Sequence, residues 1–127
     1  MEKYLDATRE QFMDFMALPI DKPLKMLNLL KFKNKVEGSD ISGEEQYNIY
    51  MKAAIPFIKE TEAEVVFYGS ARFTLIGPEA AEWDKVIIVS YPSRAHFVKM
   101  VTNKNYPAAL RIAALEDSRL IFCEEIG

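Results

Sequence analysis

The polar side chains of this chain that could do chemistry lie singly within apolar segments, and Asn28 is the first of them. Its neighbours on the same side of an alternating stretch, Met26, Leu30 and Phe32, are apolar. An amide in such a place can orient a carbonyl group or a bound oxygen species inside a cavity. It can equally bond a neighbouring side chain or a buried water. Asn28 is therefore a candidate for both catalysis and ligand binding.

His96 is the only histidine and the second candidate for catalysis. An imidazole can serve as a general base near neutral pH or as a metal ligand, but a histidine on an exposed helix surface explains the position equally simply. The acidic residues that could share a metal stand at the edges of predicted elements, at 44–45, Asp84 and 124–125. The single Cys123 excludes an intrachain disulfide and a four-cysteine zinc site. We expect no metal and no cofactor.

Two arginines are candidate anchors for an anionic ligand. Arg72 shares a predicted strand face with Tyr68, and Arg111 interrupts an otherwise apolar helical stretch. A guanidinium in such surroundings can hold a carboxylate with two hydrogen bonds. Each arginine can instead form a structural ion pair, with Glu116 or Asp84 as the partner.

Aromatic residues with polar tips are numerous enough to line a cavity for a small, partly apolar molecule. They are Tyr47, Tyr50, Tyr68, Trp83, Tyr91 and Tyr106. Some of them can equally belong to the core or to a dimer interface. The predicted ligand-binding set is Asn28, Tyr50, Arg72, Trp83, Tyr106 and Arg111. The sequence has no glycine-rich phosphate loop, no G-x-S-x-G element and no Cys/His pair, which disfavours nucleotide binding and covalent hydrolysis.

Four stretches of alternating side chains predict the strands that would position these residues. They are 25–32, 64–76, 84–91 and 119–124. In each stretch, neither of the two alternating sets is polar enough to face water. Gly69 predicts a bulge in the second stretch.

Helical spacing of apolar residues predicts the remaining elements. It covers 6–17, 47–58, the segment after Ser93 and 107–116. The last two segments read as one helix broken into two pieces.

A capping box of Ser42 and Glu45 predicts where the long helix begins. Pro56 lies inside that helix and removes one backbone hydrogen bond. We therefore expect a kink or a break near residue 52.

The order of these elements is β-α-β-β-α-β, which predicts an α+β protein with a ferredoxin-like fold. Its four-stranded antiparallel sheet would carry the helices on one face. Residues 1–22 would form an N-terminal helical extension, and residues 23–127 would form the domain. Because burial of each large apolar side chain is worth about 1.5 to 3 kcal/mol, the open face is too apolar to be left to water. We expect a second copy of the chain to cover it.

Composition narrows the class of partner. The 127 residues include 16 basic and 19 acidic side chains, which give a formal net charge of −3. Because the basic residues are scattered, neither nucleic acid nor an anionic membrane is an expected partner. No apolar run approaches the roughly 20 residues that span a bilayer, and the first residues do not resemble a secretory signal. We expect a cytoplasmic protein.

Three segments together resemble a known family. They are the stretch Met26 to Phe32, the Trp83-Asp84 pair, and Tyr91-Pro92-Ser93 followed by Phe97, Tyr106 and Arg111. Over about residues 23 to 122 the chain resembles the domain of unknown function 1330 family of the dimeric α/β-barrel superfamily. The resemblance implies that two ferredoxin-like subunits pack their sheets face to face into a barrel, with a pocket in each half. It implies no established reaction.

Related branches of that superfamily include cofactor-free monooxygenases, haem-degrading enzymes, lactone isomerases and chlorite-processing haem proteins. The haem-degrading members also place an asparagine on the first strand, as Asn28 is placed here. This chain has no histidine where those enzymes bind iron, and fold alone selects none of these chemistries.

We therefore expect a homodimeric protein that binds a small organic molecule with a carboxylate or enol group near Asn28, Tyr50, Arg72 and Arg111. Two alternatives stay open. The same pocket could serve a cofactor-independent monooxygenase or isomerase acting on an aromatic or enolic substrate, with Asn28 and a tyrosine stabilising an oxyanion. The protein could also be a non-catalytic assembly or regulatory module with a filled interior. The residues do not decide whether it is an enzyme, nor do they identify the ligand.

Overall fold

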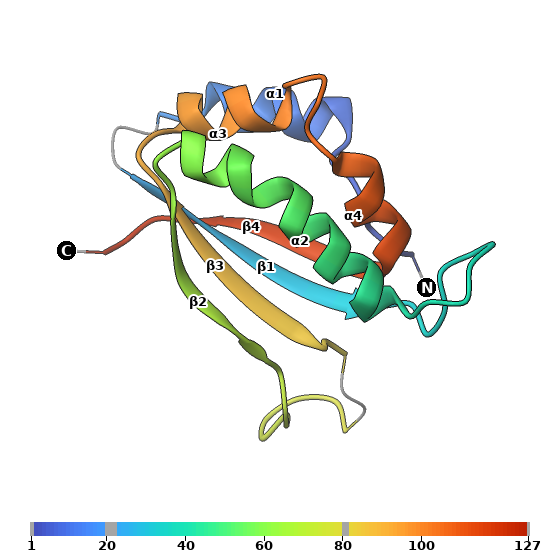
Figure 1. Ribbon diagram of the computed structural model, residues 1–127. Coiled ribbons are helices and arrows are strands. Elements are labelled where there is room, and N and C mark those ends of the chain that lie inside the picture. Colours follow the sequence, from blue (N-terminus) through green and yellow to red (C-terminus); the bar gives the residue numbers. More distant parts are fainter. Residues whose placement is uncertain (1, 20–22, 80–81, 127) are drawn as a thin grey trace.

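The chain forms a four-stranded antiparallel sheet with its helices on one face (Figure 1). The computed structural model describes residues 2–19, 23–79 and 82–126. The elements in chain order are α1 (Arg9–Ala17), β1 (Leu24–Phe32), α2 (Gly43–Glu60), β2 (Glu64–Ser70), β3 (Lys85–Tyr91), α3 (Arg94–Val101), α4 (Ala108–Ala114) and β4 (Leu115–Cys123). The strand order is β2-β3-β1-β4, so β3 lies between the parallel pair β1 and β2. This arrangement confirms the predicted α+β, ferredoxin-like fold and the additional N-terminal helix.

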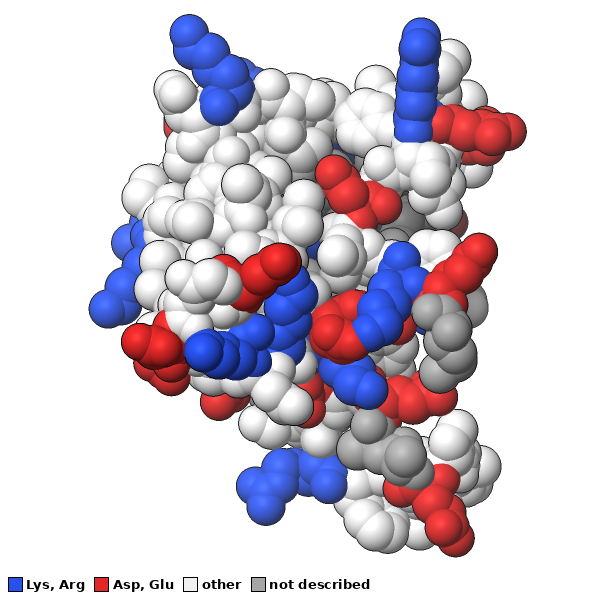
Figure 2. Space-filling model, turned by 90° about the vertical axis from the view of Figure 1, so that its right-hand side faces the viewer, with Lys and Arg blue, Asp and Glu red and all other residues white. Residues whose placement is uncertain are grey.

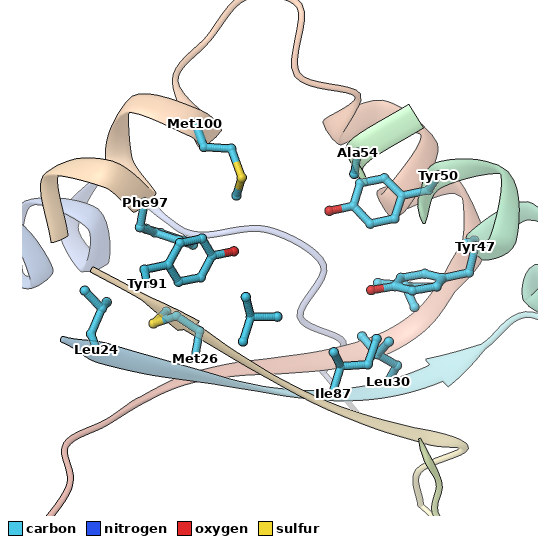
Figure 3. Packing of buried hydrophobic residues seen from close by; sticks show 13 residues of the cluster. Leu24, Met26, Leu30, Tyr47, Tyr50, Ala54, Ile87, Tyr91, Phe97 and Met100 are labelled. Carbon is cyan, nitrogen blue, oxygen red and sulfur yellow. The ribbon is translucent and has the colours of Figure 1, made fainter. Parts of the chain in front are cut away.

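The helix-facing side of the sheet builds the core (Figure 3). Alternate residues of β3, among them Ile87 and Val89, are buried, and they pair across the sheet with residues of β1 such as Met26. Leu24 and Leu30 of β1 are completely buried. The period of two in the sequence thus places one set of side chains against α2, α3 and α4.

The other side of the sheet is apolar along its middle. The strand registers align Phe67, Ile88, Leu27 and Ile121 in one row that crosses all four strands. Phe67 is 51% exposed and Ile121 is 43% exposed, and no described helix covers them. The prediction that the strands are apolar on both faces holds for this central row. We refer to the side that carries these four residues as the open face.

Helix α2 begins where the sequence predicts. The Ser42 side chain accepts a hydrogen bond from the backbone N–H of Glu45, and the Glu45 carboxylate accepts one from the backbone N–H of Ser42. Gly43 follows the cap, and its N–H donates a hydrogen bond to the carbonyl of Lys33. The N–H of Lys33 donates in turn to the carbonyl of Ala114. The helix start is therefore fixed against the ends of β1 and α4.

The predicted break near residue 52 is wrong, because α2 is a single helix through Pro56. Pro56 has no N–H to offer the carbonyl of Lys52. Both residues lie on the exposed side of the helix, where water can take the place of the missing donor. Buried Tyr50 and Ala54 on the opposite side hold the helix to the core.

The second strand ends earlier than the sequence predicts and bulges elsewhere. It stops at Ser70 instead of residue 76, and its register shifts between Val65 and Phe67, so the bulge is at Val66 and not at Gly69. As a result Val65 and Tyr68 lie on the helix side of the sheet while Phe67 lies on the open face. A period-two pattern assigns these faces wrongly, because one extra residue reverses every later side chain.

The C-terminal elements follow one another without a loop. The broken second helix is confirmed as α3 and α4, but α4 ends at Ala114 and β4 begins at Leu115 rather than at residue 119. β4 then pairs with β1 from Lys25 to Phe32, with one irregularity between Lys31 and Phe32. The direct junction ties the position of α4 to the central sheet.

The N-terminal segment lies beside the β4 edge and over α3. The backbone N–H of Tyr4 donates to Asp117 at 2.8 Å, and the Ser118 hydroxyl donates to the Tyr4 carbonyl at 2.6 Å. In α1, the ring of Phe15 packs edge-on against Phe97 and Phe122. These contacts attach residues 4–17 to the domain.

Candidate functional site

A cavity of about 160 Å³ lies between the sheet and helices α2, α3 and α4. Its wall is mostly apolar and includes Met26, Ile87 and Met100. Besides the carboxylate of Asp6 at the N-terminal segment, the polar groups in the wall are one amide, one guanidinium and four phenol hydroxyls. They belong to Asn28, Arg111, Tyr47, Tyr50, Tyr91 and Tyr106.

Asn28 and Arg111 form the polar contact at the floor of this cavity. The Nη2 of Arg111 donates to the Oδ1 of Asn28 at 3.3 Å. The Nδ2 of Asn28 donates to the carbonyl of Ile87 at 3.4 Å and to that of Met26 at 3.5 Å. The backbone of β1 and β3 thus orients the amide, and its oxygen orients the guanidinium.

The structural ion pairs that the sequence suggests for Arg111 are not formed. The carboxylate of Glu116 pairs with Lys3, and that of Asp84 accepts a hydrogen bond from the backbone N–H of Phe32 at 2.8 Å. Within the described ranges, no carboxylate oxygen lies within 4.0 Å of Arg111. The charge of Arg111 is directed into the cavity without an acidic partner.

The four tyrosines surround the same space from different elements. Figure 3 shows the hydroxyls of Tyr47 and Tyr50 on α2 and of Tyr91 on β3 pointing toward its centre. The Tyr50 hydroxyl hydrogen-bonds the Tyr106 hydroxyl, and the two rings meet edge-on. Burial raises the pKa of all four phenols above the usual value, and the Arg111 charge opposes the rise only in part. At neutral pH they are neutral hydrogen-bonding groups.

An open groove adjoins the cavity. It has a volume of about 990 Å³ and lies between the N-terminal segment and β4. Arg111, Met26, Leu5 and Asp6 are among seven residues that line both hollows. The groove is therefore a route by which a molecule from solvent can approach Arg111.

Three of the residues singled out in the sequence lie away from the cavity. Arg72 is exposed in the segment that follows β2, and the ring of Trp83 stacks on the guanidinium of Arg119 at 5.1 Å. His96 is half-buried on α3, where its Nδ1 lies 2.6 Å from the hydroxyl of the capping Ser93. The structure thus brings together Asn28, Tyr50, Tyr106 and Arg111 from the predicted set and leaves these three outside.

Two cavity residues, Tyr47 and Tyr91, were absent from the predicted ligand-binding set. Both could have been included, because Tyr47 lies on the same helical stripe as Tyr50, and Tyr91 alternates with Val89 along β3. The sequence alone did not show that both stripes face a hollow rather than packed side chains.

Neither surface charges of one sign, in the view of Figure 2, nor possible metal ligands, among the described residues, form a cluster. Figure 2 shows acidic and basic side chains intermixed on one face of the molecule, without a broad patch of either sign. Among the described residues, no group of three or more His, Cys, Asp or Glu side chains could hold a metal ion. None of the described helices is long and apolar enough to cross a membrane.

A family model described as "Domain of unknown function (DUF1330)" matches residues 36–125. The chain belongs to this family. The match includes α2 with Tyr50, the connection between α3 and α4 with Tyr106, and α4 with Arg111, and it leaves out β1 with Asn28. No curated protein matches the chain significantly.

Two solved structures of a similar protein have the same fold. The crystal structure of the methylated RPA0582 protein has a TM-score of 0.92 and 36% identity, covering 100% of this chain and 98% of that one. A second RPA0582 structure, described as a protein of unknown function from Rhodopseudomonas palustris, has a TM-score of 0.91 and 35% identity, covering 99% of both chains. Both similarities extend over the N-terminal segment.

More distant structures share the fold alone. At3g17210 from Arabidopsis thaliana has a TM-score of 0.56 and 13% identity, covering 83% of this chain and 97% of that one. A dabb family protein with a ferredoxin-like fold from Mesorhizobium loti has a TM-score of 0.52 and 11% identity, covering 84% of this chain and 100% of that one. These similarities support the ferredoxin-like fold of this chain.

Proposed function

We propose that this protein binds a small organic molecule in the tyrosine-lined cavity and that it works as a homodimer. The observation that carries the first part is the convergence of Asn28, Arg111 and four tyrosine hydroxyls on one apolar hollow. Small-molecule sites in proteins have this composition, with a few polar groups set in an apolar wall. A module with a filled interior would have no need of such a hollow.

The volume of the cavity limits the size of the ligand. Pockets for drug-sized ligands measure about 300 Å³ or more, whereas this cavity measures about 160 Å³. We therefore propose a compact ligand of one ring or a short chain. The reaction, if the protein catalyses one, is left open by this proposal.

The open face supports the second part of the proposal. Its central row of Phe67, Ile88, Leu27 and Ile121 is apolar on every strand. The loop after β2 adds Phe73, Leu75 and Ile76, which are 83%, 86% and 93% exposed. A contiguous apolar surface of this kind commonly marks an interface. A second copy related by a two-fold axis would place the same row against itself, which is the usual geometry of homodimers.

We also propose a cytoplasmic location. The single Cys123 is a free thiol and is exposed. Exposed free thiols suit a compartment that keeps cysteines reduced.

Ligand binding is tested by nuclear magnetic resonance on the isotope-labelled protein with a panel of small aromatic and aliphatic acids, phenols and amides. We expect at least one compound to shift the amides of residues around Asn28, Tyr50 and Arg111 and to leave those around Arg72 unchanged. A panel in which every compound leaves the cavity amides unmoved would refute the proposed ligand site.

The dimer is tested with Ile88→Lys, which places a charge at the centre of the open face. We expect light scattering to give about twice 14.6 kDa for the unaltered chain and the monomer mass for the variant. Ile49→Lys is the matched control, because Ile49 is an exposed residue of α2 that lies away from the open face. A monomer mass for the unaltered chain at micromolar concentration would rule out the dimer.

A further inference from the structure

We infer that the ligand is a small organic carboxylate whose anion pairs with Arg111. This inference rests on the proposed function, and it names the chemical class of the ligand for that same cavity. It follows from the charge balance of the site, from the state of the groups around it and from the shape of the hollow.

Within residues 2–19, 23–79 and 82–126, Arg111 has no carboxylate at ion-pair distance. Its guanidinium donates to the neutral Oδ1 of Asn28 at 3.3 Å. Two other cations that are at least partly buried do have a carboxylate: Arg119 pairs with Asp117 at 2.8 Å, and Lys85 pairs with Glu44 at 3.8 Å. A guanidinium has five N–H donors, and holding its charge in an apolar wall is unfavourable unless an anion balances it.

The residues around Arg111 cannot supply that anion. The cavity tyrosines are neutral at physiological pH, because burial raises their pKa. Asp6 is the acidic residue that lines the cavity, but its carboxylate accepts a hydrogen bond from the backbone N–H of Ala7 at 2.8 Å and lies more than 4.0 Å from Arg111. The negative charge must therefore come with the ligand.

A carboxylate suits these groups better than other small acids. It is fully ionised at neutral pH, whereas a simple phenol or enol is mostly neutral there. Its two oxygens match the planar N–H pair of a guanidinium. A tyrosine hydroxyl can donate to the same oxygens, since Tyr47 and Tyr50 point into the cavity from α2.

The rest of the cavity selects the body of the molecule. The wall away from Arg111 is formed by apolar side chains such as Met26, Val89 and Met100. An inorganic anion would leave this wall unfilled, and a second charge on the ligand would have no partner there. Benzoate has the required features, because it joins one carboxylate to one compact apolar ring.

The inference is tested by titration calorimetry with benzoate and its neutral isostere benzamide on the full-length protein. We expect benzoate to bind about 10- to 100-fold more tightly than benzamide, the range that a charge-assisted hydrogen bond provides. Acetate, hexanoate and inorganic phosphate extend the comparison, and hexanoate is expected to bind more tightly than acetate or phosphate.

Arg111→Gln and Arg72→Gln form a matched pair of variants. We expect Arg111→Gln to abolish the preference for benzoate and Arg72→Gln to retain it, because Arg72 is exposed outside the cavity. The comparison of benzoate with benzamide on the unaltered protein needs no variant, so the inference can be judged even if Arg111→Gln does not fold.

The outcomes separate the inference from the function on which it rests. Benzamide binding as tightly as benzoate, or an undiminished preference in folded Arg111→Gln, would overturn the carboxylate and leave the ligand site standing. If none of the acids binds but neutral compounds bind in the cavity, the carboxylate is likewise overturned and the ligand site stands. If neither acids nor neutral compounds bind, both the carboxylate and the ligand site are wrong.

Discussion

Burial keeps the four cavity tyrosines protonated beyond the pH at which a free phenol ionises. The pKa is raised at Tyr47, Tyr50, Tyr91 and Tyr106, and burial is the largest cause at each. Desolvation penalises the phenolate, which explains the direction. These four hydroxyls of the cavity lining are therefore uncharged over the whole physiological range.

This shift makes folding stability depend on alkaline pH. In the unfolded chain these tyrosines ionise near pH 10, while in the folded chain they hold their protons to higher pH. The folded state then binds more protons than the unfolded state above about pH 10, so stability is fully present below that pH and falls as the pH rises through it. We expect ultraviolet absorbance to show four tyrosines that ionise only as the protein unfolds. Ionisation of all six tyrosines near pH 10 in a chain that remains folded would contradict this.

The contact between Asn28 and Arg111 could not be predicted from the sequence. Asn28 and Arg111 are 83 positions apart and meet only because β1 and α4 both pack at the centre of the fold. Arg72 and Arg111 looked equivalent in the sequence, since each interrupts apolar neighbours. The end of β2 at Ser70 leaves Arg72 in an exposed segment, whereas the short α4 places Arg111 at the cavity.

At the scale of elements, the start of α2 depends on the absence of a side chain. A Cβ added to Gly43 would lie 2.4 Å from the carbonyl oxygen of Ala114 and 2.5 Å from the backbone nitrogen and oxygen of Lys33. These are backbone atoms that cannot move aside without displacing β1 or α4. Gly43 therefore allows three elements to meet at one point.

We expect Gly43→Ala to destabilise the protein by about 3 kcal/mol, because overpacking at a fixed backbone contact is costly. Gly38→Ala is the control, since Gly38 has a φ of +73° but no atom within 4 Å of the added Cβ. Its expected cost is only about 1 kcal/mol, from the left-handed backbone conformation. Urea denaturation of both variants measures the difference, and equal costs would show that the contact at Gly43 is unimportant.

Elements with strong local patterns were predictable, and those set by long-range contacts were not. Alternation and capping located β1, β3 and the start of α2 to within about one residue. The bulge at Val66 and the early start of β4 at Leu115 are consequences of pairing with β3 and β1. Pairing register depends on the partner strand, which a local pattern does not contain.

At the scale of the whole molecule, the sheet has one covered face and one apolar face that the described residues leave open. The sequence predicted this asymmetry correctly, because the order of elements puts all helices on one side while the strands remain apolar on both. The cavity lies on the covered side and the proposed dimer interface on the other. The two parts of the proposed function can therefore be disrupted independently.

The proposed dimerisation through the open face would make thermal stability depend on concentration. In such a dimer each subunit would stabilise the folded form of its partner, so the midpoint of thermal unfolding should rise with protein concentration. We expect this rise for the unaltered chain and its loss in Ile88→Lys, measured by scanning calorimetry over a wide concentration range. A midpoint that stays constant in the unaltered chain would argue against coupled folding and assembly.

The direct junction of α4 and β4 has a consequence for how the chain can evolve. With no connecting residues between Ala114 and Leu115, a single inserted residue there would turn α4 by about 100° around its axis relative to the strand. The side chain of Arg111 would then point away from Asn28, and their hydrogen bond would be lost. Homologues are thus free to lengthen the polar connection between β1 and α2, whereas the α4–β4 boundary should be without gaps in every alignment of proteins that keep this cavity.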